Sequence, residues 1–255
     1  MGNKTMVISS TEQLLDGKTR RNFLKLMGMG GAVVFLPSML TSCDDDDPTG
    51  PEYGSPPGSG PALVIDFSKA NDVGILQFAY ALEQLEADFY TRVVANFSSF
   101  PALDQGVLAD VKNHEVIHRE AFRAILGTTN GFTVTTTYGN LNFSDRTSVL
   151  AAAKTFEDLG VAAYNGAAQY ITVGANLGLA GKIVSVEARH AAAIRDLIAP
   201  KSGNQGPMGT SFAPQSFDDA FSPGKVVTAA QPYVVDKITP MNAPATFVQG
   251  PNNNG

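Results

Sequence analysis

Apolar residues recur at every third or fourth position along four stretches of the chain, with polar residues between them. This spacing places the apolar residues on one face of an α-helix, because a helix has about 3.6 residues per turn. The pattern therefore predicts four amphipathic helices, each burying one face. The helices are expected over residues 69–97, 101–126, 146–173 and 177–199.

Residues at the ends of these stretches are typical of helix termini. Ser68 is the predicted N-cap of the first helix, and Ser144 or Asp145 that of the third, since short polar side chains accept hydrogen bonds from free backbone N–H groups. Pro101 suits the first turn of the second helix, where no N–H is needed. Pro200 ends the fourth helix.

The links between the helices predict the topology. Residues 98–100 and 174–176 are short links, which make the helices that they join antiparallel neighbours. Residues 127–145 form a longer link, rich in Thr, Gly and Asn, that could include a small hairpin. A helix of about 26 residues is roughly 39 Å long, and this link covers about 60 Å when extended. These lengths predict an all-α bundle of two antiparallel helical hairpins joined by a long crossover.

The first 42 residues have the pattern of an export signal peptide. Arg20–Arg21 resembles a twin-arginine signal, and the apolar stretch 27–40 is too short to span a bilayer as a stable helix. Residues 40–43, Leu-Thr-Ser-Cys, resemble a bacterial lipobox. We therefore expect cleavage before Cys43, lipidation of its sulfur and anchoring in the bacterial cell envelope after export from the cytoplasm. The alternative is an uncleaved amphipathic start with an incidental thiol.

The segments beside the helical region differ from it in composition. Residues 43–65 begin with four aspartates, 44–47, and continue rich in Pro, Gly and Ser, which predicts a flexible tether. We interpret the aspartates as a solvated charge run rather than a cation site. Residues 66–200 are the expected folded domain. Residues 201–255 form a C-terminal extension that is expected to be largely irregular, with a short helix or strand at 222–235 packing on the bundle.

Charge and cysteine content exclude two kinds of protein. The formal net charge is −6 and the pI is about 5.0, which argues against a nucleic-acid partner. The single cysteine excludes an internal disulfide framework.

Acids and imidazoles interrupt the apolar stripes, that is, the rows of apolar residues along one face of each predicted helix. The second and fourth helices each carry Glu-x-x-His, and residues three apart project to the same side of a helix. Random placement of the Glu and His residues gives about 0.1 such pairs, whereas two occur, both in phase with a stripe. The inward-facing polar residues are Glu83, Glu115, His118, Glu157, Glu187 and His190.

These residues would be unstable in the core without cations. Burying an ionised carboxylate without a partner costs several kcal/mol, and four in one core would repel one another. The nearest basic residues lie off the stripes: Arg92, Lys112, Arg119, Arg123 and Arg189. Two divalent metal ions would nearly balance four carboxylates and two imidazoles. This mixture of oxygen and nitrogen ligands suits iron or manganese better than zinc.

The order Glu, Glu-x-x-His, Glu, Glu-x-x-His resembles the di-iron carboxylate pattern of the ferritin-like superfamily. The segments ALEQLEADFY, FEDLGVAAYNGAA and VEARHAAAIRDL are similar to the bacterial ferritin-like family that includes desiccation-related proteins. This resemblance covers about residues 66–200. It implies a ferritin-like four-helix bundle with a di-metal site, iron favoured, formed by the six inward-facing residues. By that family's precedent Glu115 and Glu187 would bridge the ions.

The two halves of the domain have similar residue spacings, and each half carries a tyrosine at the same distance from its first glutamate. Tyr90 stands seven residues after Glu83, as Tyr164 stands seven after Glu157. The first spacing also resembles ferritins and rubrerythrins, in which a tyrosine packs near the metals. One hypothesis gives Tyr90 and Tyr164 a catalytic redox role. The simpler interpretation is that they are core residues whose hydroxyls find a polar partner.

Other polar residues of the helices keep several interpretations. Glu86, on a neighbouring stripe, could be a supplementary metal ligand, a partner of a ligand or a boundary residue. His114 could bind metal, support a ligand or lie at the surface. Glu120 and Asp158 are expected on solvated faces.

The favoured function is a metal-dependent oxidoreductase of the envelope, acting on ferrous iron, oxygen or peroxide under stress. The alternative is a binding or desiccation-protection protein whose metals only stabilise the bundle.

The expected partners are the membrane, through Cys43, and these small molecules. The acidic run after Cys43 also resembles a surface-export signal, so the periplasmic side, the cell surface and the oligomeric state all stay open. Since twin-arginine export carries folded proteins, metal loading is expected in the cytoplasm.

Overall fold

The computed structural model describes residues 5–8, 32–35, 55–200 and 215–244. The chain divides into two compact units, residues 1–50 and 51–255. In the first unit, strands β1 (Thr5–Ile8) and β2 (Ala32–Phe35) pair in parallel. Cys43 and most of the predicted signal peptide lie outside the described residues.

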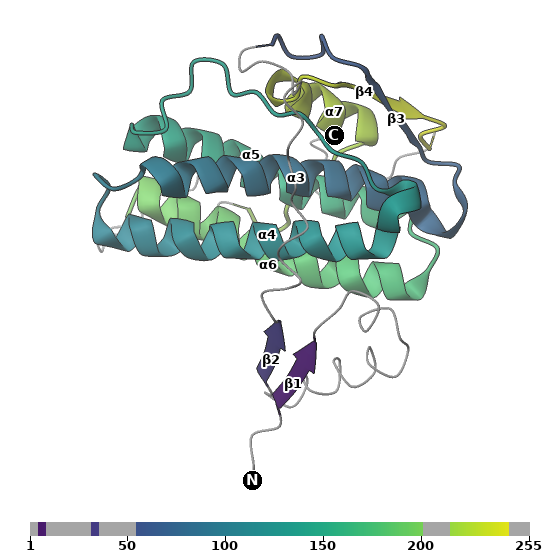
Figure 1. Ribbon diagram of the computed structural model, residues 1–255, viewed down its shortest axis with the longest axis horizontal. Coiled ribbons are helices and arrows are strands. Elements are labelled where there is room, and N and C mark those ends of the chain that lie inside the picture. Colours follow the sequence, from purple (N-terminus) through teal and green to yellow (C-terminus); the bar gives the residue numbers. More distant parts are fainter. Residues whose placement is uncertain (1–4, 9–31, 36–54, 201–214, 245–255) are drawn as a thin grey trace. The chain divides into compact units, whose positions relative to one another are not determined.

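Four long helices dominate the second unit and run side by side (Figure 1). They are α3 (Val73–Asn96), α4 (Ala102–Asn130), α5 (Arg146–Ala168) and α6 (Gly174–Ile198). Helix α3 packs against α4, and α5 packs against α6. This arrangement confirms the predicted all-α fold of two helical hairpins.

The first helix begins later than its sequence pattern suggests. Residues Ala70–Asp72 form a 3₁₀ turn, η2, in which Asn71 and Asp72 take left-handed φ angles of 57° and 62°. The prediction of Ser68 as N-cap is wrong, because its N–H and hydroxyl both donate to Asp66 Oδ1. Asn and Asp tolerate the left-handed region better than most residues, which allows the chain to turn here before α3.

The other helix ends agree with the sequence in some places and differ in others: α6 begins at Gly174, inside the predicted link 174–176. Of the two predicted caps of α5, Ser144 and Asp145, the structure shows Asp145, which accepts a hydrogen bond of 2.9 Å from the N–H of Ser148. Gly127 has φ 61° and ψ −170°, so regular α4 ends where the sequence predicts and one further turn follows. Helix α5 ends at Ala168 rather than at residue 173.

The link between the hairpins runs along the bundle, as predicted (Figure 1). It forms no hairpin. Within residues 131–145, all of which are described, the one β-bridge is antiparallel and joins Thr136 to Val234. Thr136 Oγ1 and Tyr138 OH instead donate to Asp88 Oδ2 of α3, at 2.6 and 3.0 Å. The crossover therefore contacts both α3 and the C-terminal extension.

The described part of the extension folds back onto the bundle. It contains α7 (Pro223–Ala230), the 3₁₀ turn η4 (Gln231–Tyr233) and strand β4 (Lys237–Met241). Helix α7 confirms the short element expected at 222–235. Strand β4 pairs in parallel with β3 (Ala62–Asp66). The end of the predicted tether is thus a strand. Composition did not predict it, because its partner strand lies far along the chain.

A glycine allows the extension to approach α5 closely. The N–H of Phe221 donates to the carbonyl of Ala162 at 2.9 Å. One turn further along α5, a Cβ atom on Gly166 would lie 1.9 Å from the carbonyl oxygen of Phe221. Only a residue without a side chain fits this contact.

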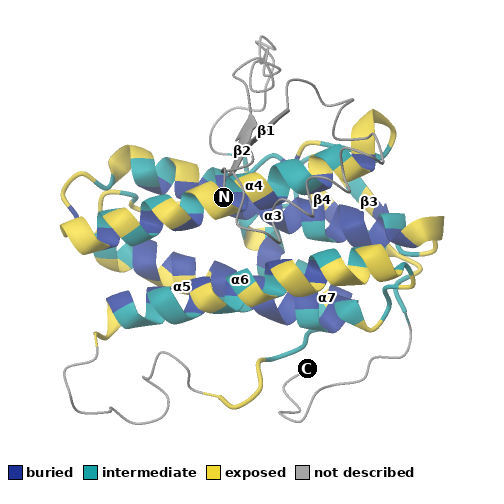
Figure 2. Cartoon of the chain, turned by 90° about the horizontal axis from the view of Figure 1, so that it is seen from below, coloured by how far each residue is buried: buried dark blue, intermediate teal, exposed yellow. Residues whose placement is uncertain are grey.

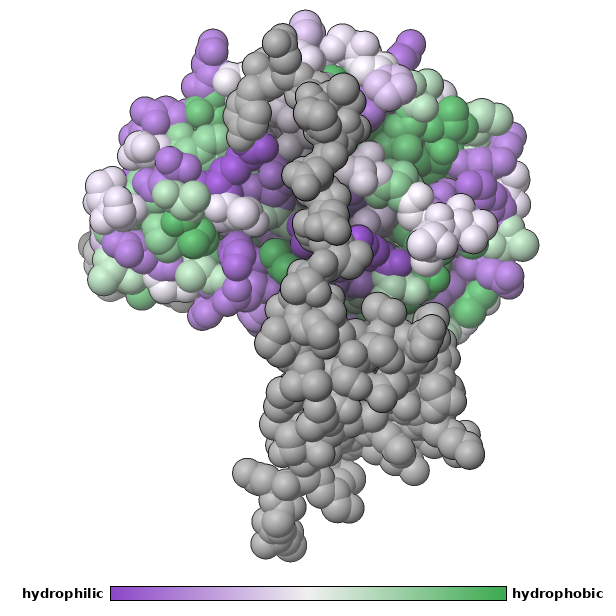
Figure 3. Space-filling model, in the orientation of Figure 1, coloured by the Kyte–Doolittle hydropathy of each residue, from purple (hydrophilic) through white to green (hydrophobic). Residues whose placement is uncertain are grey.

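Buried residues line the facing sides of the helices (Figure 2). Aromatic rings join the layers. The Phe156 ring lies 4.8 Å from Phe89 of α3 and 4.7 Å from Tyr233 of η4, measured between centroids. Hydrophobic and hydrophilic residues are interspersed on the face shown in Figure 3. Among the described residues, no helix has the length and apolar character needed to cross a membrane.

A buried carboxylate connects the start of α3 to the link between α5 and α6. Asp72 accepts hydrogen bonds from the N–H and hydroxyl of Thr172 at 2.9 and 2.6 Å, and from the N–H of Val173 at 2.9 Å. The side-chain amide of Asn176 adds a fourth at 3.0 Å. Burial opposes ionisation of Asp72, but these donors outweigh it and lower its pKa to about 2. No pattern in the sequence predicts this contact.

Replacing Asp72 with Asn is expected to lower the free energy of unfolding by about 1–3 kcal/mol, because buried donors lose their acceptor. The folded-state pKa lies below the usual value of 3.8, so the ionised carboxylate stabilises the fold above about pH 4. That contribution is lost as the pH falls from about 4 towards 2. Urea unfolding of both proteins across this range should show their difference shrinking. A constant difference would contradict this role.

Candidate metal centre

Each of the four long helices contributes to one polar cluster in the middle of the bundle. The structure brings together all six inward-facing residues of the sequence analysis: Glu83 of α3, Glu115 and His118 of α4, Glu157 of α5, and Glu187 and His190 of α6. The four carboxylates are 0% exposed. Both imidazoles are buried as well. Helical phase therefore places the polar residues of the apolar stripes inward.

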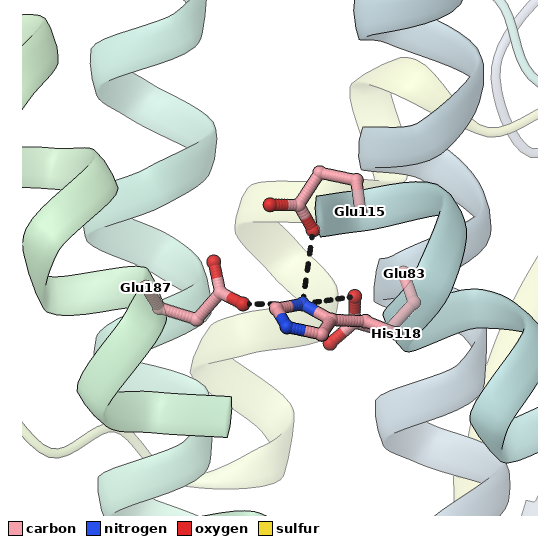
Figure 4. Close-up of side chains that lie close together, drawn as sticks. All are labelled: Glu83, Glu115, His118 and Glu187. Atoms are coloured by element: carbon pink, nitrogen blue, oxygen red, sulfur yellow. Dashed lines mark ion pairs between the residues drawn. The ribbon is translucent and has the colours of Figure 1, made fainter. Parts of the chain in front are cut away.

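One half of the cluster surrounds His118 (Figure 4). Its Nδ1 atom lies 2.9 Å from Glu187 Oε1, 3.4 Å from Glu83 Oε2 and 3.5 Å from Glu115 Oε2. Side chains from three different helices thus point at one position.

The other half surrounds His190. Its Nδ1 atom lies 2.8 Å from Glu115 Oε1, 3.3 Å from Glu157 Oε2 and 3.3 Å from Glu187 Oε2. Glu115 and Glu187 belong to both halves, and each turns one oxygen to His118 and the other to His190. The ligand atoms of each half lie within 4.8 Å of one another. This arrangement could hold two cations that share two carboxylates.

The cluster contains eight buried atoms that have no hydrogen-bond partner. They are Glu83 Oε2, both oxygens of Glu115 and of Glu187, Glu157 Oε2, and Nδ1 of His118 and His190. They lie at ion-pair distances but do not meet hydrogen-bond geometry. Buried polar atoms are rarely left unpaired, because each costs about 1–3 kcal/mol. All eight are oxygen or imidazole nitrogen donors, which fits divalent iron or manganese.

Two tyrosines hold the two unshared carboxylates. Tyr90 OH donates to Glu157 Oε1 at 2.5 Å, and Tyr164 OH donates to Glu83 Oε1. Each bond crosses between α3 and α5 and leaves the Oε2 atom of its carboxylate facing the cluster. Burial, and the carboxylates nearby, raise the pKa of both phenols well above the usual value of 10. The structure therefore places Tyr90 and Tyr164 as neutral hydrogen-bond donors behind the candidate ligands.

Glu86 makes the two halves unequal. It is buried, at 3% exposure, and its Oε1 atom would lie 3.1 Å from a Cβ atom on Gly160. Gly160 follows Glu157 by three residues, as Glu86 follows Glu83, so the glycine leaves room for the extra carboxyl group. Burial, and the four neighbouring carboxylates, raise the pKa of Glu86 well above its usual value. The signal for this room in the sequence is the difference between the halves, a glycine at 160 where the other half has Glu86.

Without metal ions, protons must balance the charge of the cluster. Burial opposes protonation of His118 and His190, but neighbouring carboxylates, Glu115 foremost, outweigh it and raise the pKa of each imidazole to about 12. Burial raises the pKa of Glu157 to about 8. Glu187 stays ionised in spite of its burial, because the two imidazoles lower its pKa to about 2. Both histidines therefore hold an extra proton at neutral pH.

Metal loading is expected to release protons for this reason. An imidazole must be neutral to bind a metal ion, so at least one proton should leave per ion and affinity should rise with pH. Calorimetric titration of metal-free protein with Mn²⁺ at pH 7, in two buffers of different ionisation enthalpy, counts the protons. Binding without proton release would contradict protonation of both imidazoles in the metal-free protein.

The remaining residues of the sequence analysis lie outside the cluster. Glu120 pairs with Arg119 at 2.8 Å near the surface. Asp158 pairs with Lys154 at 3.2 Å and also with Arg195. His114 is exposed, with its Nδ1 atom 2.9 Å from Nε2 of His190, so it contacts a candidate ligand from outside.

Comparison with known proteins gives one result for the same region. Residues 71–200 match the sequence model of the ferritin-like domain, and this range contains every residue of the cluster. No curated protein matches the chain.

Proposed function

Because the chain belongs to the ferritin-like domain family, we propose that its buried Glu/His cluster binds two ions of iron or manganese, with iron favoured. We further propose that the loaded protein is an oxidoreductase acting on ferrous iron, oxygen or peroxide. The observation that carries the proposal is the convergence of eight unpartnered buried donor atoms on two positions. Protein groups of the described region leave these atoms unsatisfied, and two divalent cations would satisfy them.

The proposal gives each residue a role. The first ion would be held by Glu83, Glu115, His118 and Glu187, and the second by Glu115, Glu157, Glu187 and His190. Two such metal ions would supply electrons by cycling between divalent and trivalent states. Tyr90 and Tyr164 orient the unshared carboxylates through their hydroxyl protons, and the buried helix faces exclude bulk water. A redox role for either tyrosine stays a hypothesis, as does binding of a metal by Glu86.

Metal content and turnover test this function together. The protein lacking residues 1–42 should bind two ions per chain by elemental analysis and consume oxygen or peroxide when supplied with ferrous iron. Glu120→Gln serves as a matched control, because it removes one acidic charge outside the cluster. One or no tightly held ion per chain would end the proposal.

One observation favours a second function, a protection protein in which the metals only stabilise the bundle and no substrate is converted. The four carboxylates are 0% exposed and come from all four helices, so ions between them would tie the bundle together. Chelation should then lower the melting temperature strongly, and the loaded protein should show no turnover. A loaded protein that turns over substrate excludes this alternative.

We also propose export through the twin-arginine route and lipid anchoring at Cys43, in the periplasm-facing membrane or at the cell surface. The support is the sequence alone: Arg20–Arg21, the apolar stretch and the Leu-Thr-Ser-Cys ending. Cys43→Ser should release the protein from membranes. Replacement of both arginines by lysine should retain it, with metal already bound, in the cytoplasm. A membrane-bound Cys43→Ser protein would refute the anchor.

A further inference from the structure

His114 of α4 touches the metal centre only through another histidine. Its Nδ1 atom lies 2.9 Å from Nε2 of His190, across the gap between α4 and α6. The two ring planes are 11° apart, with centroids 5.1 Å apart. The nitrogen–nitrogen distance and the two ring radii account for almost all of the centroid separation. The rings therefore meet edge to edge in a hydrogen bond, and do not overlap face to face.

The orientation of His190 fixes the direction of this bond. Its Nδ1 atom faces the carboxylates of Glu115, Glu157 and Glu187. An imidazole that binds a metal through Nδ1 carries its proton on Nε2 and donates it to a neighbouring acceptor. The only described acceptor at hydrogen-bond distance from His190 Nε2 is Nδ1 of His114.

The other half of the centre has no such partner. His114 directly precedes Glu115, and the corresponding position before Glu187 is Val186. Valine has no polar side-chain atom, and no hydrogen bond to Nε2 of His118 occurs among the described residues. The ring of His118 therefore lacks a restraint that the ring of His190 has, although each histidine follows a shared glutamate by three residues.

We propose that His114 is a positioning residue that fixes the ring and tautomer of His190, and so makes the second metal position bind more tightly than the first. The inference rests on the proposed di-metal function and adds an inequality between the two positions. Acceptors behind a metal-binding histidine commonly change metal affinity by about 10- to 100-fold.

The test is a stepwise titration of metal-free protein with Co²⁺, followed by visible absorbance against a competing chelator. In His114→Ala, one ion should bind as in the wild type and the other about 10- to 100-fold more weakly. His114→Asn, whose amide oxygen can accept the same hydrogen bond, should restore most of the affinity. Val186→Ala is the matched control, because it changes the corresponding residue of the other half. Circular dichroism checks that each variant is folded.

Two further variants identify the ion that is affected. Glu83→Gln should keep only the second ion, and His114→Ala should still weaken it. Glu157→Gln should keep only the first ion, and His114→Ala should then have no effect. If the wild type binds two ions and His114→Ala leaves both affinities unchanged, or weakens both equally, the inference fails while the proposed function stands. If the wild type binds fewer than two, the proposed function fails first.

Discussion

Replacing Glu187 with Gln is expected to abolish tight binding of both metal ions, whereas the same replacement at Glu157 should abolish only one. Glu187 turns Oε1 towards His118 and Oε2 towards His190, so it serves both positions. Glu157 serves only the position beside His190. Loss of a shared ligand removes one donor from each ion, and the neutral amide also removes a charge that both ions need.

Elemental analysis after dialysis measures this difference directly. We expect two ions per chain in the wild type, one in Glu157→Gln and none in Glu187→Gln, with turnover lost in both variants. Glutamine has nearly the shape of glutamate, so the metal-free variants should fold, as their circular dichroism will report. Equal metal content in the two variants would show that Glu187 does not bridge.

Replacing Gly166 with Ala should destabilise the domain strongly, although it adds a single methyl group. The new Cβ atom would lie 1.9 Å from the carbonyl oxygen of Phe221, which belongs to backbone and cannot rotate away. Either α5 or the segment before α7 must move, and the hydrogen bond from Phe221 to Ala162 is then lost. Overpacking of this kind typically costs about 1–3 kcal/mol. Because backbone is displaced, we expect the upper end of that range.

Gly181→Ala is the matched control, since a Cβ atom there meets nothing within 4 Å. Alanine forms helix more readily than glycine, so this variant should be more stable by up to about 1 kcal/mol. Urea unfolding of both variants beside the wild type gives the comparison. A Gly166→Ala protein as stable as the wild type would mean that the extension does not rest on α5 in solution.

The sequence predicted the four helices and the inward direction of six polar residues, because both follow from helical period. A stripe repeats every three or four residues whatever the helix packs against, so the spacing alone places Glu115 and His118 on the same face. Link lengths then fixed which helices are antiparallel. The identity of the core-facing residues therefore needed only local information.

Contacts between elements far apart in sequence could not be derived in this way. The pairing of β3 with β4 joins two segments that each appear irregular by composition. The bond between His114 and His190 depends on how far α4 and α6 are rotated towards each other, which periodicity leaves undetermined. Glu86 has several interpretations from sequence for the same reason, because its burial depends on the room that Gly160 of another helix leaves.

The pairing of β3 with β4 has a practical consequence for the boundaries of an independently stable fragment. Residues 71–200 match the family, but a fragment cut to that range would lose Tyr233, which packs on Phe156, and the segment that covers Ala162. Newly bared aromatic surface of this kind favours aggregation. The smallest soluble piece should therefore begin before Ala62 and continue past Met241, so that both ends of the domain are retained together.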